Sequence, residues 1–276
     1  MVKVDINGRS IYYDGYLLNN LQTAKEVIQK DWDMVFIIDG IEGSGKSVLA
    51  QQIAFFLDST LTIDRVVFTP QEFTDAIVKA GKYQAIIYDE AYRGLSSRQA
   101  MSQVNKALVS MMAEIRQKNL YIFIVIPCFF ELDKYMALWR SRALLHVYTG
   151  EKFKRGFFSF FSIEKKKRLY IKGKKLYEYL ESPNFRGRFV KGYCVDEEQY
   201  RARKLEVLRI AETKKDKREQ NWINQRNILI IELTHFISQQ EIADCIRLDK
   251  RTISDIIIED RETKEEQRLK RQNFEI

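Results

Sequence analysis

One stretch, Asp39–Ser47, constrains the fold of this 276-residue chain more than any other. Its sequence, DGIEGSGKS, fits the pattern G-x-x-x-x-G-K-S. The apolar run 34–39 before it predicts a buried strand, and the spacing of residues 47–57 predicts a helix. A strand, a glycine-rich turn and a helix in this order predict a phosphate cradle, because backbone N–H groups and the positive end of the helix face the same anion.

The pattern also predicts what the cradle holds, namely ATP and Mg²⁺. Lys46 is expected to reach the β and γ phosphates, and the Ser47 hydroxyl to ligate the metal ion. The alternative is a glycine turn that binds nothing. The residues expected to line the nucleotide are Gly40, Ile41, Glu42, Gly43, Ser44, Gly45, Lys46, Ser47 and Val48.

An acidic pair supplies the partner that such a loop needs. The apolar run 83–88 predicts a buried strand that ends in Asp89 and Glu90. In a parallel sheet, ligands bind at the C-terminal ends of the strands. We expect Asp89 to hold Mg²⁺ and Glu90 to polarise the attacking water as general base. A water-activating carboxylate favours ATP hydrolysis over phosphorylation of a metabolite, although an acidic turn at a strand end is the alternative.

The first half of the chain alternates apolar strands with helices. This pattern predicts an α/β fold of the P-loop NTPase (RecA-like) type, with a parallel sheet and helices on both faces. We assign it to a domain of residues 1–150, opened by a hairpin over 1–19 with an Asn7-Gly8 turn. The expected strands after the first are 64–69, 83–88, 121–126 and 143–148, and a helix is expected over 132–140.

The character of the sequence changes after residue 150. Residues 151–195 are predicted to form a basic, β-rich extension, with a strand over 156–163 and a hairpin turning at 172–174. Residues 196–276 are charged and of helical spacing, and we assign them to an α-helical domain.

Within that helical domain, residues 239–254 resemble a helix-turn-helix. Ala243 is small where two helices would cross, and Ile253 would be the buried anchor of the second helix. Arg247 stands where a turn glycine is usual, so it should adopt a left-handed backbone. A helical pair with a purely structural role is the alternative. Further core residues are expected at Ile242, Ile246 and Leu248, and DNA contacts at Lys250, Arg251, Thr252 and Ser254.

Charge and composition narrow the class of protein. The net charge is +8, and by our count residues 151–276 carry all of it, which indicates a polyanionic partner for that half. No apolar run approaches the ~20 residues of a membrane span, and the N-terminus lacks the apolar core of a signal peptide. Three scattered cysteines and two distant histidines predict neither disulfides nor a zinc site. We therefore expect a soluble, cytoplasmic protein without a membrane partner.

An arginine is expected to stabilise the charge of the transition state. Arg140 and Arg142 stand before the predicted strand 143–148, where they could meet the site of a neighbouring subunit. A surface salt bridge is the alternative role for any one arginine. The remaining candidates are Arg93, Arg98 and Arg116.

Several pieces together resemble one family. They are the strand ending in Asp89-Glu90, the helix end 112–119 (MAEIRQKN), the segment 131–135 (ELDKY) and the Arg140-x-Arg142 pair. Over residues 30–150 the chain resembles the HerA–FtsK superfamily of DNA-translocating ATPases, and most closely the zonular-occludens-toxin-like ATPases of viruses and mobile elements. The resemblance implies a ring, usually a hexamer, that moves DNA with ATP and supplies arginine fingers in trans. One departure is 126–128 (IPC), where that superfamily often has a polar sensor.

These observations predict an ATP-hydrolysing DNA motor that acts as an oligomeric ring of viral or mobile-element type, as a translocase, packaging or helicase-like ATPase. A second hypothesis is a nucleotide-gated DNA-binding adaptor or regulator, of the transposition-helper or initiator type, that does not translocate. A packaging ATPase of the large-terminase type is disfavoured, because the region after residue 150 shows no cluster of carboxylates for a nuclease metal site.

Overall fold

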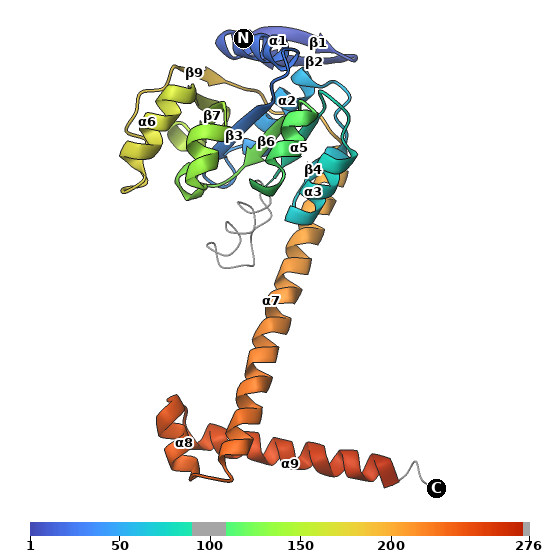
Figure 1. The fold of residues 1–276 in the computed structure, drawn as a ribbon, viewed down its shortest axis with the longest axis vertical. Helices are drawn as coiled ribbons and strands as arrows, with labels where there is room; N and C mark the ends of the chain where they lie inside the picture. Colours follow the sequence, from blue (N-terminus) through green and yellow to red (C-terminus); the bar gives the residue numbers. More distant parts are fainter. Residues whose placement is uncertain (90–108, 273–276) are drawn as a thin grey trace. The chain divides into compact units, whose positions relative to one another are not determined.

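The computed structural model of the protein describes residues 1–89 and 109–272 (Figure 1). The chain divides into two compact units, Met1–Ala211 and Glu212–Ile276. We call them the first and the second unit and describe each by itself.

The first unit is an α/β structure built on a seven-stranded sheet. Its strands lie side by side in the order β4 (Val66–Val67), β5 (Ala85–Tyr88), β6 (Tyr121–Val125), β3 (Met34–Gly40), β7 (Ala143–Tyr148), β8 (Phe157–Phe161) and β9 (Phe185–Arg188). The first five are parallel, and β8 and β9 are antiparallel to their neighbours. From β3 the chain crosses to β4, returns through β5 and β6, and then continues to β7 on the other side of β3. The order of strands therefore reverses at β3, where ligands of such sheets bind.

Helices cover both faces of the sheet, as the sequence predicts (Figure 1). Successive side chains of β3 alternate, so that Phe36 and Ile38 enter one core while Val35 and Ile37 enter the other. The first core includes residues of α1 (Gly15–Ile28) and α2 (Lys46–Leu57). The second includes residues of α3 (Pro70–Lys79), α5 (Met112–Gln117) and α6 (Ile163–Gly173). Both faces of β3 are thus closed to water, which explains its unbroken apolar sequence.

The boundary predicted at residue 150 does not separate two compact units. β8 pairs with β7 and β9 pairs with β8, so residues 151–195 extend the central sheet instead of forming a separate extension. The predicted hairpin around 172–174 is also wrong, because α6 occupies Ile163–Gly173. Its helical period is carried by Lys166, Leu169, Tyr170 and Gly173, which are all buried. The hairpin of β1 (Val2–Ile6) and β2 (Arg9–Tyr13) is confirmed.

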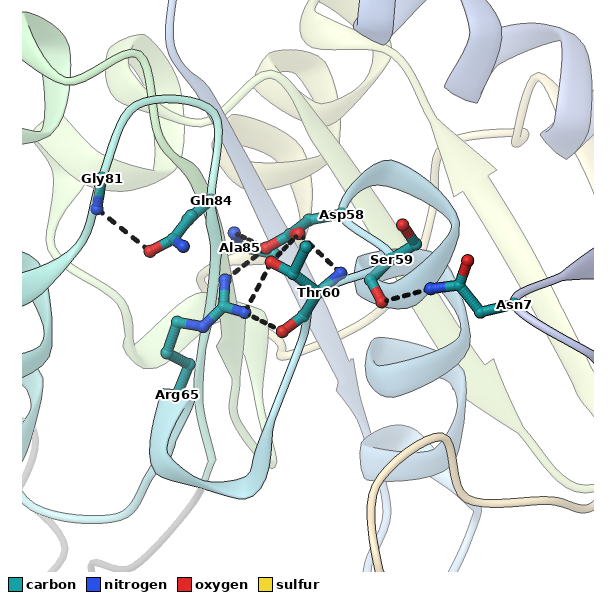
Figure 2. Close-up of polar contacts among 8 residues, drawn as sticks. All are labelled: Asn7, Asp58, Ser59, Thr60, Arg65, Gly81, Gln84 and Ala85. Atoms are coloured by element: carbon teal, nitrogen blue, oxygen red, sulfur yellow. Dashed lines mark hydrogen bonds and ion pairs between the residues drawn. The ribbon is translucent and has the colours of Figure 1, made fainter.

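A polar cluster joins the far end of α2 to the start of β5 (Figure 2). Asp58 follows α2, and its carboxylate accepts hydrogen bonds from Thr60 N (2.9 Å), Thr60 Oγ1 (2.6 Å) and Ala85 N (2.8 Å). The Arg65 guanidinium forms an ion pair with the same carboxylate. Burial by itself would raise the pKa of Asp58, but these hydrogen bonds and Arg65 lower it below its usual value. The cluster therefore fixes α2 against β5.

A turn of π-helix, η3 (Met136–Arg140), replaces most of the α-helix predicted over 132–140. Ser141 Oγ donates to Met136 O (2.9 Å) and Ala137 O (3.3 Å), and Lys166 Nζ from α6 also donates to Ala137 O. Lys166 is fully buried, and burial, with smaller contributions from Lys167 and Arg142, lowers its pKa to about 7. A buried amine thus satisfies a carbonyl of the irregular turn. Shorter helical turns lie at Ile63–Arg65, Phe129–Glu131 and Glu151–Phe153.

The second unit is helical. It contains the C-terminal part of α7 (Glu197–Leu233), followed by α8 (Gln239–Ile246) and α9 (Lys250–Gln272). Ile242, Ala243 and Ile253 form a small core with Ile230 and Ile256. This confirms three of the predicted core positions, and Leu248 packs against them, whereas Ile246 is 38% exposed.

The turn between α8 and α9 has the backbone that the sequence predicts. Arg247 ends α8 with φ 56° and ψ 41°, in the left-handed region. The start of α8 is fixed by a capping box, in which Ser238 Oγ accepts from Glu241 N and the Glu241 carboxylate accepts from Ser238 N. Over the part of the chain that the structure describes, no helix is long and apolar enough to span a membrane.

Candidate functional site

The candidate site is the Gly40–Ser47 loop, which joins the end of β3 to α2. Gly40 and Gly45 have φ of +139° and +104°, values that side chains rarely allow. A Cβ on Gly40 would lie 2.0 Å from Val147 O of β7, and one on Gly45 would lie 3.0 Å from the Phe189 ring. Both glycines of the motif are therefore required by close approach as well as by backbone conformation.

The interior of the loop is polar. Lys46 is only 6% exposed, and its Nζ donates to Gly40 O (2.6 Å) and Ile41 O (3.1 Å). Ser44 is 1% exposed, and its Oγ has no hydrogen-bond partner among the residues that the structure describes. Leaving such a buried hydroxyl unpaired costs about 1–3 kcal/mol. A bound anion with acceptor oxygens would satisfy Ser44 and would compete with the loop carbonyls for Lys46, so these residues fit a phosphate group.

The other predicted loop residues divide by exposure. Ile41, Glu42 and Gly43 are exposed and form the rim of the loop. Ser47 and Val48 lie in the first turn of α2 and are half-buried, and the Val48 side chain packs against the core under α2. The Val48 side chain therefore helps to hold α2 in place.

Asp89 lies directly after β5 and is fully buried. Only β6 separates β5 from β3, so Asp89 and the Gly40–Ser47 loop share the C-terminal edge of the sheet. The Tyr200 hydroxyl of α7 donates to Asp89 Oδ2 (2.5 Å), and Ser47 is also a hydrogen-bond partner of this phenol. Burial and the Asp89 charge raise the Tyr200 pKa. The Tyr200 hydroxyl is thus a hydrogen-bond partner of both predicted metal ligands, Ser47 and Asp89.

A hydroxyl and a single carboxylate fit Mg²⁺, which keeps several waters and takes substrate phosphates as further ligands. They do not fit a metal that needs a cage of protein ligands. The described ranges contain no group of three His, Cys, Asp or Glu side chains able to hold a metal ion.

A buried network holds the start of the loop. Asp39 is fully buried, and its carboxylate accepts hydrogen bonds from Phe129 N (3.0 Å) and from the Tyr179 hydroxyl. His146 Nδ1 lies 3.0 Å from Asp39 Oδ1, and its ring centroid is 3.7 Å from that of Tyr179. After the end of β6, in the segment 126–128 (IPC), Pro127 O accepts a hydrogen bond from Gly40 N (3.3 Å). These contacts give His146 a structural partner.

Arg140 and Arg142 lie at the opposite edge of the sheet. Arg140 forms an ion pair with buried Asp33, just before β3, and burial lowers its pKa to about 10. Arg142 N donates to Val35 O (2.7 Å) at the beginning of β3, and the Arg142 guanidinium lies 4.7 Å from the centroid of the Trp32 ring. Within one chain neither arginine meets the Gly40–Ser47 loop. Glu90, Arg93 and Arg98 lie outside the described residues.

The predicted DNA-contact residues lie in the first turns of α9. Lys250 and Arg251 are exposed there, whereas Thr252 and Ser254 are half-buried. Arg251 N donates to Asp249 Oδ1 (2.8 Å), which caps the start of α9. The two basic side chains can therefore contact a polyanion without rearrangement of the helix.

One segment beside the site was not predicted from the sequence. Residues 189–200 run from β9 along α2 into α7, and we call this segment the strap. Gln52 Nε2 of α2 donates to Val190 O (2.8 Å) and Gly192 O (3.0 Å), and Gln51 Oε1 accepts from Cys194 N (3.2 Å). The strap places the Phe189 ring next to Gly45 and the Tyr200 hydroxyl next to Asp89. The signal in the sequence was Gln51-Gln52 within the otherwise apolar run 48–57, because amide side chains in such a run require polar partners when they are buried.

The fold and the loop define an α/β protein with a candidate phosphate-binding site at the C-terminal edge of a mostly parallel sheet. No protein-family model matches the chain, and no curated protein matches it either.

Proposed function

We propose that the protein is an ATP-hydrolysing DNA motor that works as an oligomeric ring. The observation that carries the nucleotide part is the buried pair of Lys46 and unpartnered Ser44 in a glycine loop, with Asp89 at the same edge of the sheet. The strand order, with β6 between the loop strand and the Asp89 strand, is compatible with a RecA-like arrangement.

In this proposal the chain's own residues bind and orient the nucleotide. Backbone N–H groups of the Gly40–Ser47 loop and the N-terminus of α2 face the phosphates, and Lys46 neutralises the β and γ oxygens. Ser47 and Asp89 would hold Mg²⁺, which supplies positive charge to the phosphate oxygens. A water oxygen bonds to the γ-phosphorus as the bond to the ADP oxygen breaks, and Glu90 keeps its predicted role of accepting the proton from the water.

The DNA part of the proposal rests on the basic half of the chain. Residues 151–276 carry the whole net charge of +8, and α8 and α9 meet at a left-handed turn with Lys250 and Arg251 exposed beside it. A short helix, a tight turn and a second helix with basic residues at its start are typical of the helix-turn-helix. Arg140 and Arg142 could act only on the site of a neighbouring subunit of the ring.

The test is the rate of ATP hydrolysis with no DNA, with single-stranded DNA and with double-stranded DNA, together with the mass in a non-hydrolysable ATP analogue. We expect DNA to raise the rate, the analogue to favour an oligomer, and Lys46→Ala to abolish hydrolysis. Lys82→Ala, which removes an exposed lysine from the turn before β5, is the matched control and should keep the wild-type rate. A monomer whose hydrolysis neither DNA stimulates would refute the motor.

The α8–α9 pair also supports a second candidate, a nucleotide-gated DNA-binding adaptor that does not move along DNA. Displacement of a triplex strand from double-stranded DNA separates the two functions. A motor displaces the strand only with hydrolysable ATP, whereas an adaptor binds the duplex and leaves the triplex intact.

A further inference from the structure

The turn between β7 and β8, residues 149–156, lies at the same edge of the sheet as the Gly40–Ser47 loop. Lys152 and Phe153 both have left-handed backbones, with φ of 53° and 56°. Such a conformation costs about 1–2 kcal/mol for each residue with a side chain. Phe153 is 85% exposed, so no packing of its ring compensates for this cost. Backbone strain of this kind persists where the surroundings enforce it and is concentrated at functional sites.

The surroundings of this turn do enforce its shape. Gly150 N donates to Lys154 O (2.8 Å), which closes the turn on itself. On the other side of Arg155, Phe189 N donates to Gly156 O (2.9 Å). Gly156 has a φ of +98°, and a Cβ there would lie 2.6 Å from Phe189 O. These two hydrogen bonds, one on each side of Arg155, therefore fix its backbone.

This backbone directs the side chain of Arg155 to the rim of the candidate site. A Cβ placed on Gly43 would lie 3.6 Å from Arg155 Nη2. Arg155 also influences Tyr193 of the strap: burial raises the pKa of Tyr193, and the charges acting on its phenol include those of Arg155 and Asp89. Arg155 and Asp89 therefore both lie close enough to the Tyr193 phenol for their charges to act on it.

We propose that Arg155 binds the terminal phosphate of a nucleotide held by the Gly40–Ser47 loop of its own chain. The inference rests on the proposed function. For the arginine that contacts the terminal phosphate, the sequence suggested Arg140 or Arg142 of a neighbouring subunit, whereas here the arginine belongs to the same chain as the loop. A guanidinium matches two phosphate oxygens at once and stays charged at all working pH values. The strained turn fixes the backbone from which it reaches them, so less freedom is lost when the phosphate binds.

Nucleotide affinity tests the assignment without relying on hydrolysis. The affinities for ADP and for a non-hydrolysable ATP analogue, both with Mg²⁺, are measured by calorimetry on the full chain. Arg155→Ala should weaken binding of the analogue by about 10- to 100-fold, the range expected for a lost charge-assisted contact, and ADP binding by about threefold or less. Arg155→Lys should lie between. Arg188→Ala, which removes an exposed arginine that stacks on Phe157 nearby, should leave both affinities unchanged.

A mixture of two variants separates the same chain from a neighbour. If Arg155 acted across subunits, a mixture of the Arg155→Ala and Lys46→Ala proteins would contain restored sites. Such a site would combine the intact Lys46 of an Arg155→Ala subunit with the intact Arg155 of a neighbouring Lys46→Ala subunit, and it would bind the analogue tightly. We expect no restoration, and restoration would overturn the assignment. Equal loss of ADP and analogue binding, or no loss, in Arg155→Ala would also overturn it. Wild-type protein that binds neither nucleotide would instead overturn the proposed function, and this inference with it.

Discussion

Replacing Lys166 with Met should stabilise the first unit and remove part of its dependence on pH. Lys166 is fully buried under η3, and burial lowers its pKa from 10.5 to about 7. Met has a similar length, carries no charge and adapts to irregular cavities. The substitution therefore removes the cost of burying an amine while it fills nearly the same space.

The lowered pKa sets the size and the sign of the effect. The gap between 10.5 and about 7 corresponds to about 5 kcal/mol of destabilisation at pH 7 and below. Between pH 7 and 10.5 the unfolded chain holds a proton that the folded chain lacks, so stability rises with pH by up to about 1.4 kcal/mol per pH unit. Against this, Met loses the hydrogen bond to Ala137 O, worth about 1–3 kcal/mol. Because Ser141 Oγ still donates to Ala137 O, the net gain at pH 7 should be about 2–4 kcal/mol.

Urea unfolding of wild type and Lys166→Met at pH 7, 8 and 9 measures both quantities. The difference between the two proteins should shrink as pH rises, since wild type gains stability through this range and the variant lacks the Lys166 contribution. Lys175→Met, at an exposed lysine just after α6, is the control and should follow wild type. A Met variant that is less stable at pH 7, or a difference that stays constant with pH, would refute the reasoning.

Two further substitutions test the fold. Asp58→Asn should destabilise the first unit by about 2–4 kcal/mol at pH 7, because it leaves the largely buried Arg65 without its counter-charge. Since the pKa of Asp58 is lowered, its contribution is present above pH 3.8 and is lost as pH falls further. Urea unfolding at pH 7 measures the loss, and a change below about 0.5 kcal/mol, typical of surface sites, would contradict it. Arg247→Gly should stabilise the second unit by about 0.5–1 kcal/mol by relieving the left-handed backbone, and a lower thermal midpoint would contradict this expectation.

The sequence could predict the elements whose signal is local. The strands that became β3, β5, β6 and β7 are short apolar runs, and their alternation with helices predicts a mostly parallel sheet. α6 was missed because its buried face includes Lys166, which breaks the apolar period. The pairing of β8 and β9 with β7 was missed because antiparallel partners are chosen by contacts distant in sequence.

The residues of the candidate site likewise divide into those that a local sequence pattern predicts and those that it does not. Lys46, Ser47 and Asp89 stand in local patterns and could be located by spacing. Tyr200 and Arg155 have no such pattern, and only the course of the strap and the strained turn brings them to the loop.

The pairing of β8 and β9 with the sheet, and the contacts of the strap with α2, decide where the chain can be cut. A fragment ending at residue 150 would leave one whole side of β7 without a hydrogen-bonding neighbour, along an apolar strand (ALLHVY) that invites pairing between molecules. It would also remove the backbone groups of the strap that pair with Gln51 Oε1 and Gln52 Nε2 of α2. Ending at residue 211 keeps all of these contacts, so we expect the later boundary to be the better one at which to produce the first unit, with its candidate site, on its own.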